Sequence, residues 1–524
     1  MFSHLQGTTL GFRVPTFLNP GWVIASAIFL LAFSGRSAGQ NGALPATVPA
    51  PAHGMFIFNP PIADQRCGIN GWPRQCFSAH LLPTLICTGK DTPAGYNCTQ
   101  AGAGSAYVKG AVFDVPWGVV NPGNDKYDFS QLDNWMQPWV AAGKLVSFIF
   151  EPTSNYGGYM PAWYMAQVPI ATVSQTAGII SLNTAAAMEF FPGGAAASTG
   201  LEIQISGTGT ALDGDGTIAN PGIWKVCDHT TPGCQDPSLQ TIYAIGGGSD
   251  IAPVSTGTVG NPVYGSADGS TCTSGVIPIE WRINFIHAWR AVIRKATAHY
   301  ASNPSIGYMR FGMGIGGQSN PTSGANLTGC QAQMTQFGFT SVSDPWPLPG
   351  KGQWPQVAVN WIDHLNNMCG YIKSQNGTSP AMITISPIEF NPEDFSTANA
   401  TAANASYNGL GFGSQGLQKS DPVNFAAGKP CAGGNWCANF QKHKGKVTLE
   451  LQTLFYSDPT NVSETGSLAI LLPFATSVSA SVFELYMDDW MCTYDSTWAG
   501  NNTYSACQLG GYPAAFAAAA ASVN

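Results

Sequence analysis

The chain has 524 residues, a formal net charge of −8 and only 10% charged residues, against about 25% in an average soluble domain. The acidic balance argues against a nucleic-acid-binding protein, which needs a basic surface. The length suits one large barrel with insertions better than a single small domain.

The N-terminus carries a short apolar run at residues 21–33, with a basic residue upstream and small residues after it. Because a membrane span needs about 20 apolar residues, the run predicts a signal peptide over residues 1–40, with an uncleaved anchor as the alternative. A Pro/Ala linker at 41–53 follows. We therefore expect a secreted protein, extracellular or periplasmic.

A strand–helix–strand rhythm begins after the linker. Strands are predicted at 54–61, 107–120 and 144–152, and a helix with apolar positions at helical spacing lies between the last two. Residues 54–165 form the first part of the predicted barrel. Residues 166–276 are rich in Gly, Ser, Thr and Ala and show hairpin patterns, which predicts a β-rich insertion after the third strand.

The rhythm resumes over residues 277–524. Helices are predicted at 279–301, 356–373 and 512–523, and strands at 306–317, 382–390, 409–416, 446–455 and 481–490. The count gives eight strands that alternate with helices, so the predicted fold is α/β, a (β/α)8 TIM barrel with the insertion after strand three. An open doubly wound sheet is the competing architecture.

The stretch "RFGMGIGGQSNP", residues 310–321, contains the spacing G-x-G-x-x-G. A dinucleotide fingerprint needs a helix directly after the glycines and an acidic residue about 20 positions on, and neither is present. We therefore expect no nucleotide cofactor. If the stretch is the fourth strand, Arg310, Gly312, Gly314, Gly316 and Gln318 share one face, with Gln318 at the carboxyl end.

Carboxylates are scarce, and several fall near predicted strand ends, where barrel enzymes hold their active sites. A carboxylate in an apolar strand is costly unless it is paired, protonated or functional. Glycoside hydrolysis uses two such groups. The acidic candidates are Asp114, Glu151, Glu389, Glu450, Glu484, Asp488 and Asp489. The last two are neighbours that would point in opposite directions if both were in a strand.

Aromatic side chains accompany these acids, and their faces can stack on sugars. Ordinary barrel packing is the other interpretation of each one. The complete set expected to bind a carbohydrate substrate is Asp114, Trp117, Glu151, Tyr156, Trp163, Arg310, Gln318, Gln452, Tyr456, Glu484, Tyr486, Asp488 and Trp490.

Residues 112–164 resemble the second and third barrel units of clan-A glycoside hydrolases, particularly the β-galactosidase-like members. The shared features are a strand, an aromatic residue and a proline, then "YDFSQLD", a helix, and an aromatic loop with "PAW". The resemblance implies an acid/base Glu after strand four and a nucleophile Glu on strand seven.

Glu450 falls on the seventh predicted strand and is the expected nucleophile, although it could instead be an interior carboxylate satisfied by Arg310. Gln318 stands where the family keeps its acid, and an amide cannot supply that proton. Glu389 is the preferred substitute, followed by Glu484, Asp488 and Glu151. The sequence thus predicts a two-carboxylate glycoside hydrolase. The alternative is a non-catalytic carbohydrate-binding protein on a decayed barrel.

The chain contains 13 cysteines, and disulfides are expected in an exported protein. Pairing of sequence neighbours gives Cys67–Cys76, Cys87–Cys98, Cys227–Cys234, Cys330–Cys369, Cys431–Cys437 and Cys492–Cys507, with Cys272 left over. No cysteine or histidine spacing suits a structural zinc, so no metal is expected.

Overall fold

A computed structural model describes residues 50–58, 106–153, 159–214, 222–247, 249–268, 271–280, 282–314, 354–375, 380–384, 410–428, 431, 436–454, 457–494 and 505–523. All of these belong to one compact unit, Ala46–Asn524. The predicted signal peptide, most of the predicted linker and four of the predicted site residues lie outside the described residues.

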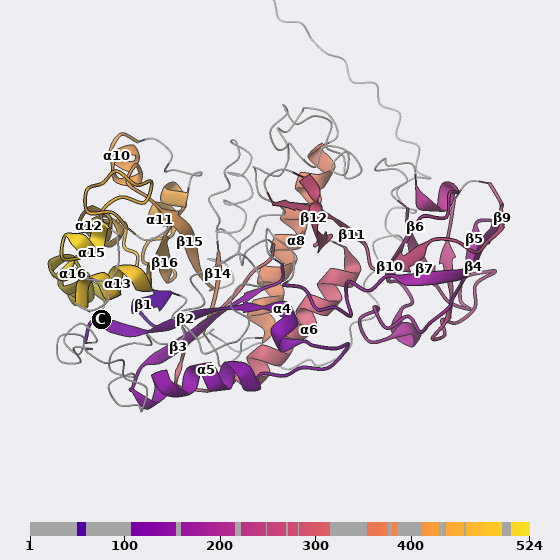
Figure 1. The fold of residues 1–524 in the computed structure, drawn as a ribbon, viewed down its shortest axis with the longest axis horizontal. Coiled ribbons are helices and arrows are strands. Elements are labelled where there is room, and N and C mark those ends of the chain that lie inside the picture. The colour runs from indigo at the N-terminus through magenta and orange to yellow at the C-terminus, as the bar shows by residue number, and fades with distance from the viewer. Residues whose placement is uncertain are drawn as a thin grey trace, which may run out of the picture. The chain divides into compact units, whose positions relative to one another are not determined.

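Eight parallel strands close into a barrel in the spatial order β1-β17-β16-β15-β14-β13-β3-β2 (Figure 1). Neighbouring strands follow chain order around the whole ring, which is the (β/α)8 topology, and the predicted fold class is confirmed. The strands are β1 (Gly54–Phe58), β2 (Val108–Pro116), β3 (Leu145–Glu151), β13 (Ile306–Phe311), β14 (Ala381–Thr384), β15 (Gly411–Leu417), β16 (Leu449–Thr453) and β17 (Val482–Tyr486).

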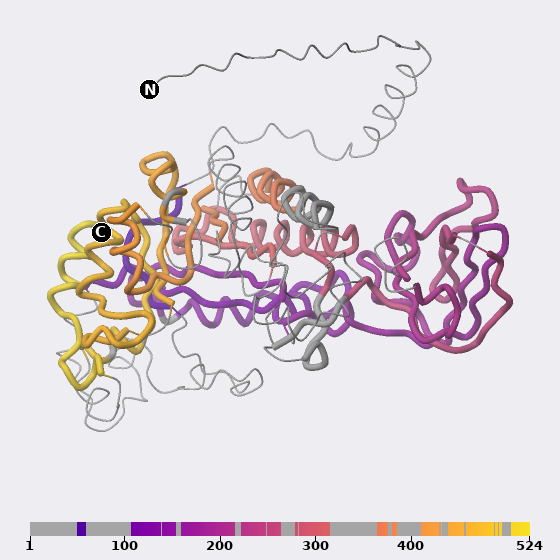
Figure 2. The backbone as a smooth tube through the Cα atoms, turned by 90° about the horizontal axis from the view of Figure 1, so that it is seen from above, coloured from indigo at the N-terminus to yellow at the C-terminus, as the bar shows by residue number. Residues whose placement is uncertain are grey.

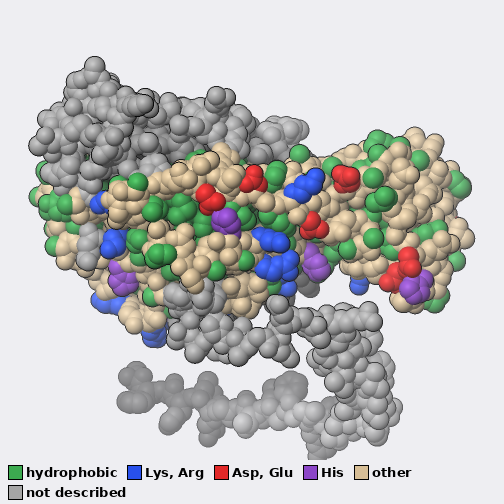
Figure 3. Space-filling model, turned by 90° about the horizontal axis from the view of Figure 1, so that it is seen from below, with side chains coloured by type: hydrophobic (Ala, Val, Ile, Leu, Met, Phe, Trp, Pro, Cys, Tyr) green, Lys and Arg blue, Asp and Glu red, His purple; other side chains and the backbone are tan. Residues whose placement is uncertain are grey.

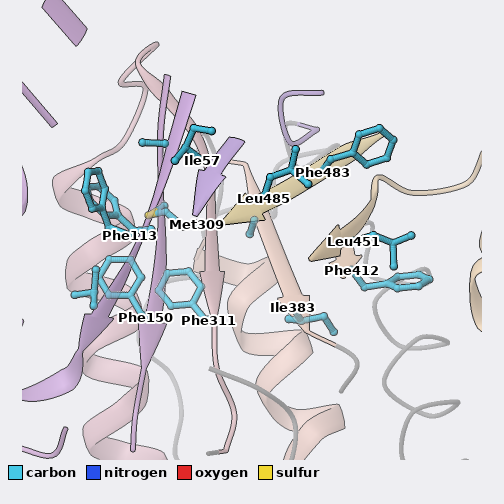
Figure 4. Packing of buried hydrophobic residues seen from close by; sticks show 14 of the residues in the cluster. Ile57, Phe113, Phe150, Met309, Phe311, Ile383, Phe412, Leu451, Phe483 and Leu485 are labelled. Atoms are coloured by element: carbon cyan, nitrogen blue, oxygen red, sulfur yellow. The ribbon is translucent and has the colours of Figure 1, made fainter. Parts of the chain in front are cut away.

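Alternation along these strands sorts their side chains into two layers. One set lies outside the ring, against the helices, and includes Phe113, Phe150, Met309, Leu451 and Phe483 (Figure 4). The other set fills the interior, where Phe56, Val112, Ile149, Tyr308, Met382 and Val482 form a separate buried cluster. Residues that alternate with the outer set, such as Asp114, Glu151, Arg310, Glu450 and Glu484, therefore face the interior.

Helices cover the outside of the ring, and the longer ones bury an apolar face. α6 buries Phe285, Trp289 and Ile293 at helical spacing, and these side chains pack in the same core as those of α5. The described helices are α4 (Trp117–Val120), α5 (Ser130–Ala141), α6 (Ile283–His299), α8 (Trp354–Gln375), α10 (Asp421–Ala426), α11 (Trp436–His443), α12 (Leu468–Ser477), α13 (Met487–Tyr494), α15 (Ser505–Gln508) and α16 (Pro513–Val523).

The segment that follows β3, as far as Pro278, is mostly β-structure, as predicted. Seven antiparallel strands lie in the order β10-β6-β7-β8-β5-β4-β9, and β10 also pairs with β4, so six of them close on themselves around their own apolar core. Figure 2 shows these strands wound into a unit of their own. They are β4 (Val168–Thr176), β5 (Ile179–Thr184), β6 (Glu202–Ser206), β7 (Ile223–Cys227), β8 (Thr241–Ile245), β9 (Ile251–Val254) and β10 (Thr258–Gly260). A hairpin, β11 (Val263–Asp268) and β12 (Thr271–Pro278), leads back to the barrel.

Buried amides fasten this insertion to the start of α6. Asn284 Nδ2 donates to Glu202 O (2.8 Å) and to Asn261 Oδ1 (2.6 Å). Asn261 Nδ2 in turn donates to the carbonyls of Tyr164 (3.0 Å) and Phe190 (2.6 Å). Arg282 adds an ion pair with Glu202 (3.0 Å). The joint is therefore a network of buried hydrogen bonds and one ion pair between insertion and barrel.

The structure corrects the predicted extent of the fourth strand through the glycine-rich stretch after Arg310. β13 ends at Phe311, and Gly312 and Gly314 lie beyond it. Two hydrogen bonds hold Gly312: its N donates to Phe150 O (2.9 Å), and its O accepts from the side-chain Nε1 of Trp289 (2.8 Å). The predicted shared face of Arg310 with these glycines is therefore wrong, because the strand ends too early.

Two further predictions are corrected. The predicted strand at 481–490 ends at Tyr486, and α13 begins at Met487, so Asp488 and Asp489 occupy a first helical turn. Cys369 is a buried free thiol whose pKa burial raises to about 12, so the expected pair with Cys330 is not formed. The pairs Cys227–Cys234, Cys431–Cys437 and Cys492–Cys507 are confirmed.

Charged side chains are sparse on the described surface in Figure 3, as the composition requires. The charges that matter most are instead inside the barrel, and glycines make room for them. A Cβ at Gly413 on β15 would overlap Glu450 Oε2, and one at Gly307 would lie 2.7 Å from Ser147 Oγ and 3.1 Å from the Phe56 ring. Glycine at 413 is thus required by the side chain of Glu450.

We predict that Gly413→Ala lowers the free energy of unfolding by about 1–3 kcal/mol, the usual cost of overpacking a core. Gly370→Ala is the matched control, because Gly370 lies in α8 with open space around its Cα. That control should gain about 0.5–1 kcal/mol from helix propensity. Urea unfolding of both variants measures the contrast. Equal stability of Gly413→Ala and the parent chain would show that Glu450 does not lie over β15.

Candidate functional site

Two acidic side chains stand near the carboxyl ends of adjacent barrel strands. Glu151 is the last residue of β3, and Asp114 is the third residue from the end of β2. In the strand register Asp114 pairs with Ile149 and Pro116 pairs with Glu151, so the two acids are diagonal neighbours on the interior face. The carboxyl end of the ring is where barrel enzymes place their chemistry. We call Asp114 and Glu151 the strand-end pair.

The two carboxyls of the strand-end pair influence each other. Glu151 is 5% exposed. Burial raises its pKa well above the ordinary value, the charge of Asp114 raises it further, and Arg310 opposes both effects. The phenol of Tyr159 lies close enough that burial and both acids raise its pKa as well. A backbone bond from Gly118 N to Tyr159 O (2.7 Å) fixes this tyrosine beside the end of β2.

Below this pair, a network of charged and polar side chains crosses the barrel interior. Arg310 on β13 is fully buried, and its Nη1 lies 3.0 Å from Glu450 Oε2 on β16 and 3.1 Å from both carboxylate oxygens of Glu484 on β17. Tyr308 Oη donates to Glu484 Oε1 (2.6 Å), and Arg310 Nη2 donates to Gln452 Oε1 (3.3 Å). We call these five residues the Arg310 cluster.

The two glutamates of the cluster are not equivalent. Glu484 accepts bonds on both oxygens, from Tyr308 and Arg310, whereas Glu450 accepts one bond on Oε2. Among the residues that the structure describes, Glu450 Oε1 has no hydrogen-bond partner. Burial and the charge of Glu484 raise the pKa of Glu450 well above normal, against the influence of Arg310. Glu450 is therefore the carboxyl that keeps a proton more readily.

Arg310 itself keeps its charge in this setting. Burial disfavours the charged guanidinium, but Glu484 and Glu450 outweigh burial and raise the pKa of Arg310 above its ordinary value. Burial also raises the pKa of Glu484, while Arg310 and the hydroxyl of Tyr308 lower it in part. The cluster therefore sets one charged guanidinium against two buried carboxyls, and burial raises the pKa of both carboxyls.

The position of Glu450 differs from the expectation that it stands at a strand's carboxyl end. It is the second residue of β16, and Glu484 is the middle residue of β17, and both are 0% exposed. Glu450 thus lies near the amino end of its strand and is engaged by Arg310, the alternative that the sequence left open. Gln452, also expected at the site, belongs to the same interior network.

The aromatic residues expected to stack on sugar are divided by the structure. Trp117 and Trp490 are fully buried in the main core, and Trp163 is half-buried and packs edge-on against Trp117 with ring centroids 6.2 Å apart. Tyr486 faces the interior at the end of β17, where its hydroxyl donates to Leu454 O (3.1 Å). Packing accounts for the positions of both buried tryptophans.

The remaining predicted residues lie elsewhere. Asp488 is buried in the first turn of α13, and the neighbouring Asp489 accepts bonds from Ser457 N (2.9 Å) and Oγ (2.6 Å). Tyr156, Gln318, Glu389 and Tyr456 lie outside the described residues.

Sequence reasoning missed Tyr308. It sits two residues before Arg310 in "IGYMRF", and strand alternation alone places both on one face.

None of the described helices is long and apolar enough to cross a membrane. Within the described residues, no three His, Cys, Asp or Glu side chains gather in a way that could hold a metal ion.

We predict that Glu450 makes the unfolding free energy depend on pH. A carboxyl whose pKa is raised by folding stabilises fully below its unfolded value and loses that contribution as the pH rises toward its folded value. Relative to Glu450→Gln, the parent chain should therefore lose up to about 1.4 kcal/mol per pH unit above about pH 5. Urea titrations over a pH series measure this difference.

The exposed Glu464→Gln serves as the control and should follow the parent chain across the series. A parent chain that gains stability relative to Glu450→Gln as the pH rises would contradict a protonated Glu450.

Solved structures include chains of similar fold at low sequence identity. The fold is similar to the catalytic domain of a β-amylase from Paenibacillus polymyxa, with 10% identity and a TM-score of 0.45 over 83% of this chain and 92% of that chain. No family model matches the sequence, and no curated protein does. The likeness is too distant to bear on the chemistry, and the barrel assignment rests on the closed strand order.

Proposed function

We propose that this protein is a glycoside hydrolase in which the strand-end pair performs the reaction on a poly- or oligosaccharide. The observation that carries the proposal is the pair itself: two carboxyls on adjacent strands, near the carboxyl end of a barrel, with the charge of one raising the pKa of the other. Glycosidic cleavage requires two such groups, a proton donor for the leaving oxygen and an ionised partner.

The two environments assign the roles. Glu151 is buried and its pKa is raised, which favours the protonated form that a general acid needs. Asp114 is more exposed and acts as the ionised partner, either as nucleophile or as the base that activates water. Environments that push two acids apart in this way are the usual basis for dividing acid and base roles.

Glu450, predicted as nucleophile, fits this scheme less well than Asp114. Its carboxyl is fully enclosed below the strand ends and already contacts Arg310 at 3.0 Å. A nucleophile must reach the anomeric carbon of a bound sugar, which needs access from the open end of the barrel. The proposal therefore places Glu450 in the interior network. Glu389 stays a prediction, since it lies outside the described residues.

The disulfides support a second part of the proposal, that the protein works outside the cytosol. Three pairs close short loops in the insertion and near the C-terminal part of the chain. Disulfides persist in oxidising compartments and are rare in the cytosol. Export fits a hydrolase that meets its polysaccharide outside the cell, in line with the predicted signal peptide.

We predict that Glu151→Gln and Asp114→Asn each lower kcat/KM by about 100-fold to 10,000-fold, the usual contribution of a positioned acid or base. Screening a panel of aryl glycosides and polysaccharides first identifies a cleaved substrate, and initial rates on it then give the change. Glu189→Gln, an exposed acid on the insertion, is the control and should keep the parent rate.

The pH profile should show the same division of roles. The rate of the parent enzyme falls as rising pH deprotonates Glu151, so this limb should lie above the range of an ordinary carboxyl and disappear in Glu151→Gln. Full turnover in both single variants would overturn the assignment. Binding of glycans without cleavage of any of them would instead support a carbohydrate-binding protein.

A further inference from the structure

Arg310 connects the two groups of charged residues described above. In the strand register both Asp114 on β2 and Arg310 on β13 pair with Ile149 of β3, so the three residues form one row across adjacent strands. Glu151 lies two residues further along β3, on the same interior face. The carboxyl of Glu151 is therefore a diagonal neighbour of Asp114 on one side and of Arg310 on the other.

The same guanidinium faces downward into the cluster. Its Nη1 contacts Glu450 and Glu484, and Nη2 contacts Gln452, all from the far side of the barrel. One positive charge thus faces two carboxyls below it and the strand-end pair above it. How much of its field reaches Glu151 depends on how many of the lower carboxyls are ionised.

Counting charges limits the possibilities. Arg310, Glu450 and Glu484 are each 0% exposed, so a net charge on the three has no water to stabilise it. One guanidinium and two ionised carboxylates would leave one negative charge unpaired in the interior, at a cost of several kcal/mol. One proton on the carboxyls brings the group to neutrality, and Glu450 Oε1, which accepts no bond from the described residues, is free to carry it.

We propose that Glu450 and Glu484 hold one proton between them, so that a single negative charge is set against the guanidinium of Arg310. This inference rests on the proposed function for its catalytic meaning. Its consequence is that the cluster shields Glu151 from most of the charge of Arg310. Glu151 then keeps the proton that a general acid needs.

The groups that face the cluster from the other strands do not change this count. β14 contributes Met382 and Thr384, β15 contributes the glycine at 413, and β1 contributes Phe56, whose ring packs against Tyr308 with centroids 5.3 Å apart. Among the described residues, the other titratable groups on the interior face are Tyr308, whose pKa burial and both glutamates raise, Tyr486, and the strand-end acids themselves. The balance therefore lies among Arg310 and the carboxyls.

The experiment compares Glu450→Gln, Glu484→Gln and the double variant, with Glu464→Gln as the control. Infrared spectra at neutral pH record the carbonyl stretch of protonated carboxyls. A shared proton predicts that each single variant loses one carboxyl's intensity, because the glutamate left behind ionises against Arg310. The double variant should lose no more than either single variant, and the control should lose nothing.

The second readout is the ionisation of Glu151, taken as the infrared difference between each variant and the same variant carrying Glu151→Gln over a pH series. Both single variants keep one carboxylate on Arg310, so the pKa of Glu151 should match that of the parent. The double variant leaves the guanidinium unbalanced, and the pKa of Glu151 should fall by about one unit or more. The alkaline limb of kcat/KM should move by the same amount.

Two outcomes overturn the inference: single variants that lose no carboxyl intensity, or a double variant whose Glu151 ionises at the parent pH. Both infrared readouts need no substrate. Loss of hydrolysis on every glycan, together with the predicted infrared pattern, would contradict the proposed function and leave the shared proton in place. Circular dichroism of each variant confirms that the barrel has folded.

Discussion

A single guanidinium facing two carboxyls inside a closed barrel is the constraint on which the rest of this structure depends. The interior of an eight-stranded barrel is normally filled by apolar side chains. Here Arg310 spans it from β13 to β16 and β17. The strands around it make room with glycine at 307 and 413 and enclose it with aromatic rings. The same few residues therefore set the space and the polarity of the barrel interior.

The charged interior separates two levels that have different tasks. The lower level is closed, with every charged group at 0% exposure, and its contacts are internal. The upper level is at the strand ends, where Asp114 is partly exposed and Glu151 nearly buried. A buried ion pair contributes little net stability compared with an apolar filling of equal size. Its retention here is better explained by the electrostatic conditions that it imposes on the level above.

The sequence predicted the barrel because its signals are local. Apolar strands, amphipathic helices such as 283–299 and a Gly/Thr-rich insertion each follow from residues close together in the chain. The heights of side chains within the barrel could not be predicted in the same way. The predicted strand 446–455 begins three residues before β16 and ends two residues after it, and the register with β17 places Glu450 low in the ring.

Contacts between residues far apart in the chain could not be predicted from the sequence either. The sequence raised Arg310 as a possible partner of Glu450, but not the second glutamate or Tyr308, which reach the same point from other strands. Just after the end of β13, Trp289 Nε1 of α6 donates to the Gly312 carbonyl, a contact that no periodicity reveals. Burial of Trp117 and Trp490 likewise depends on which side of the ring each faces.

The insertion between β3 and β13 has a consequence for how the chain reaches this state. These two strands are neighbours in the ring, yet the whole of residues 152–305 separates them. Joining distant segments costs chain entropy and slows folding. Because the insertion closes around its own apolar core, we expect it to form first and to bring the two strand ends together through the Asn261–Asn284 joint. A preformed insertion shortens the loop that must close before β3 and β13 pair, and so lowers the chain-entropy cost of that step.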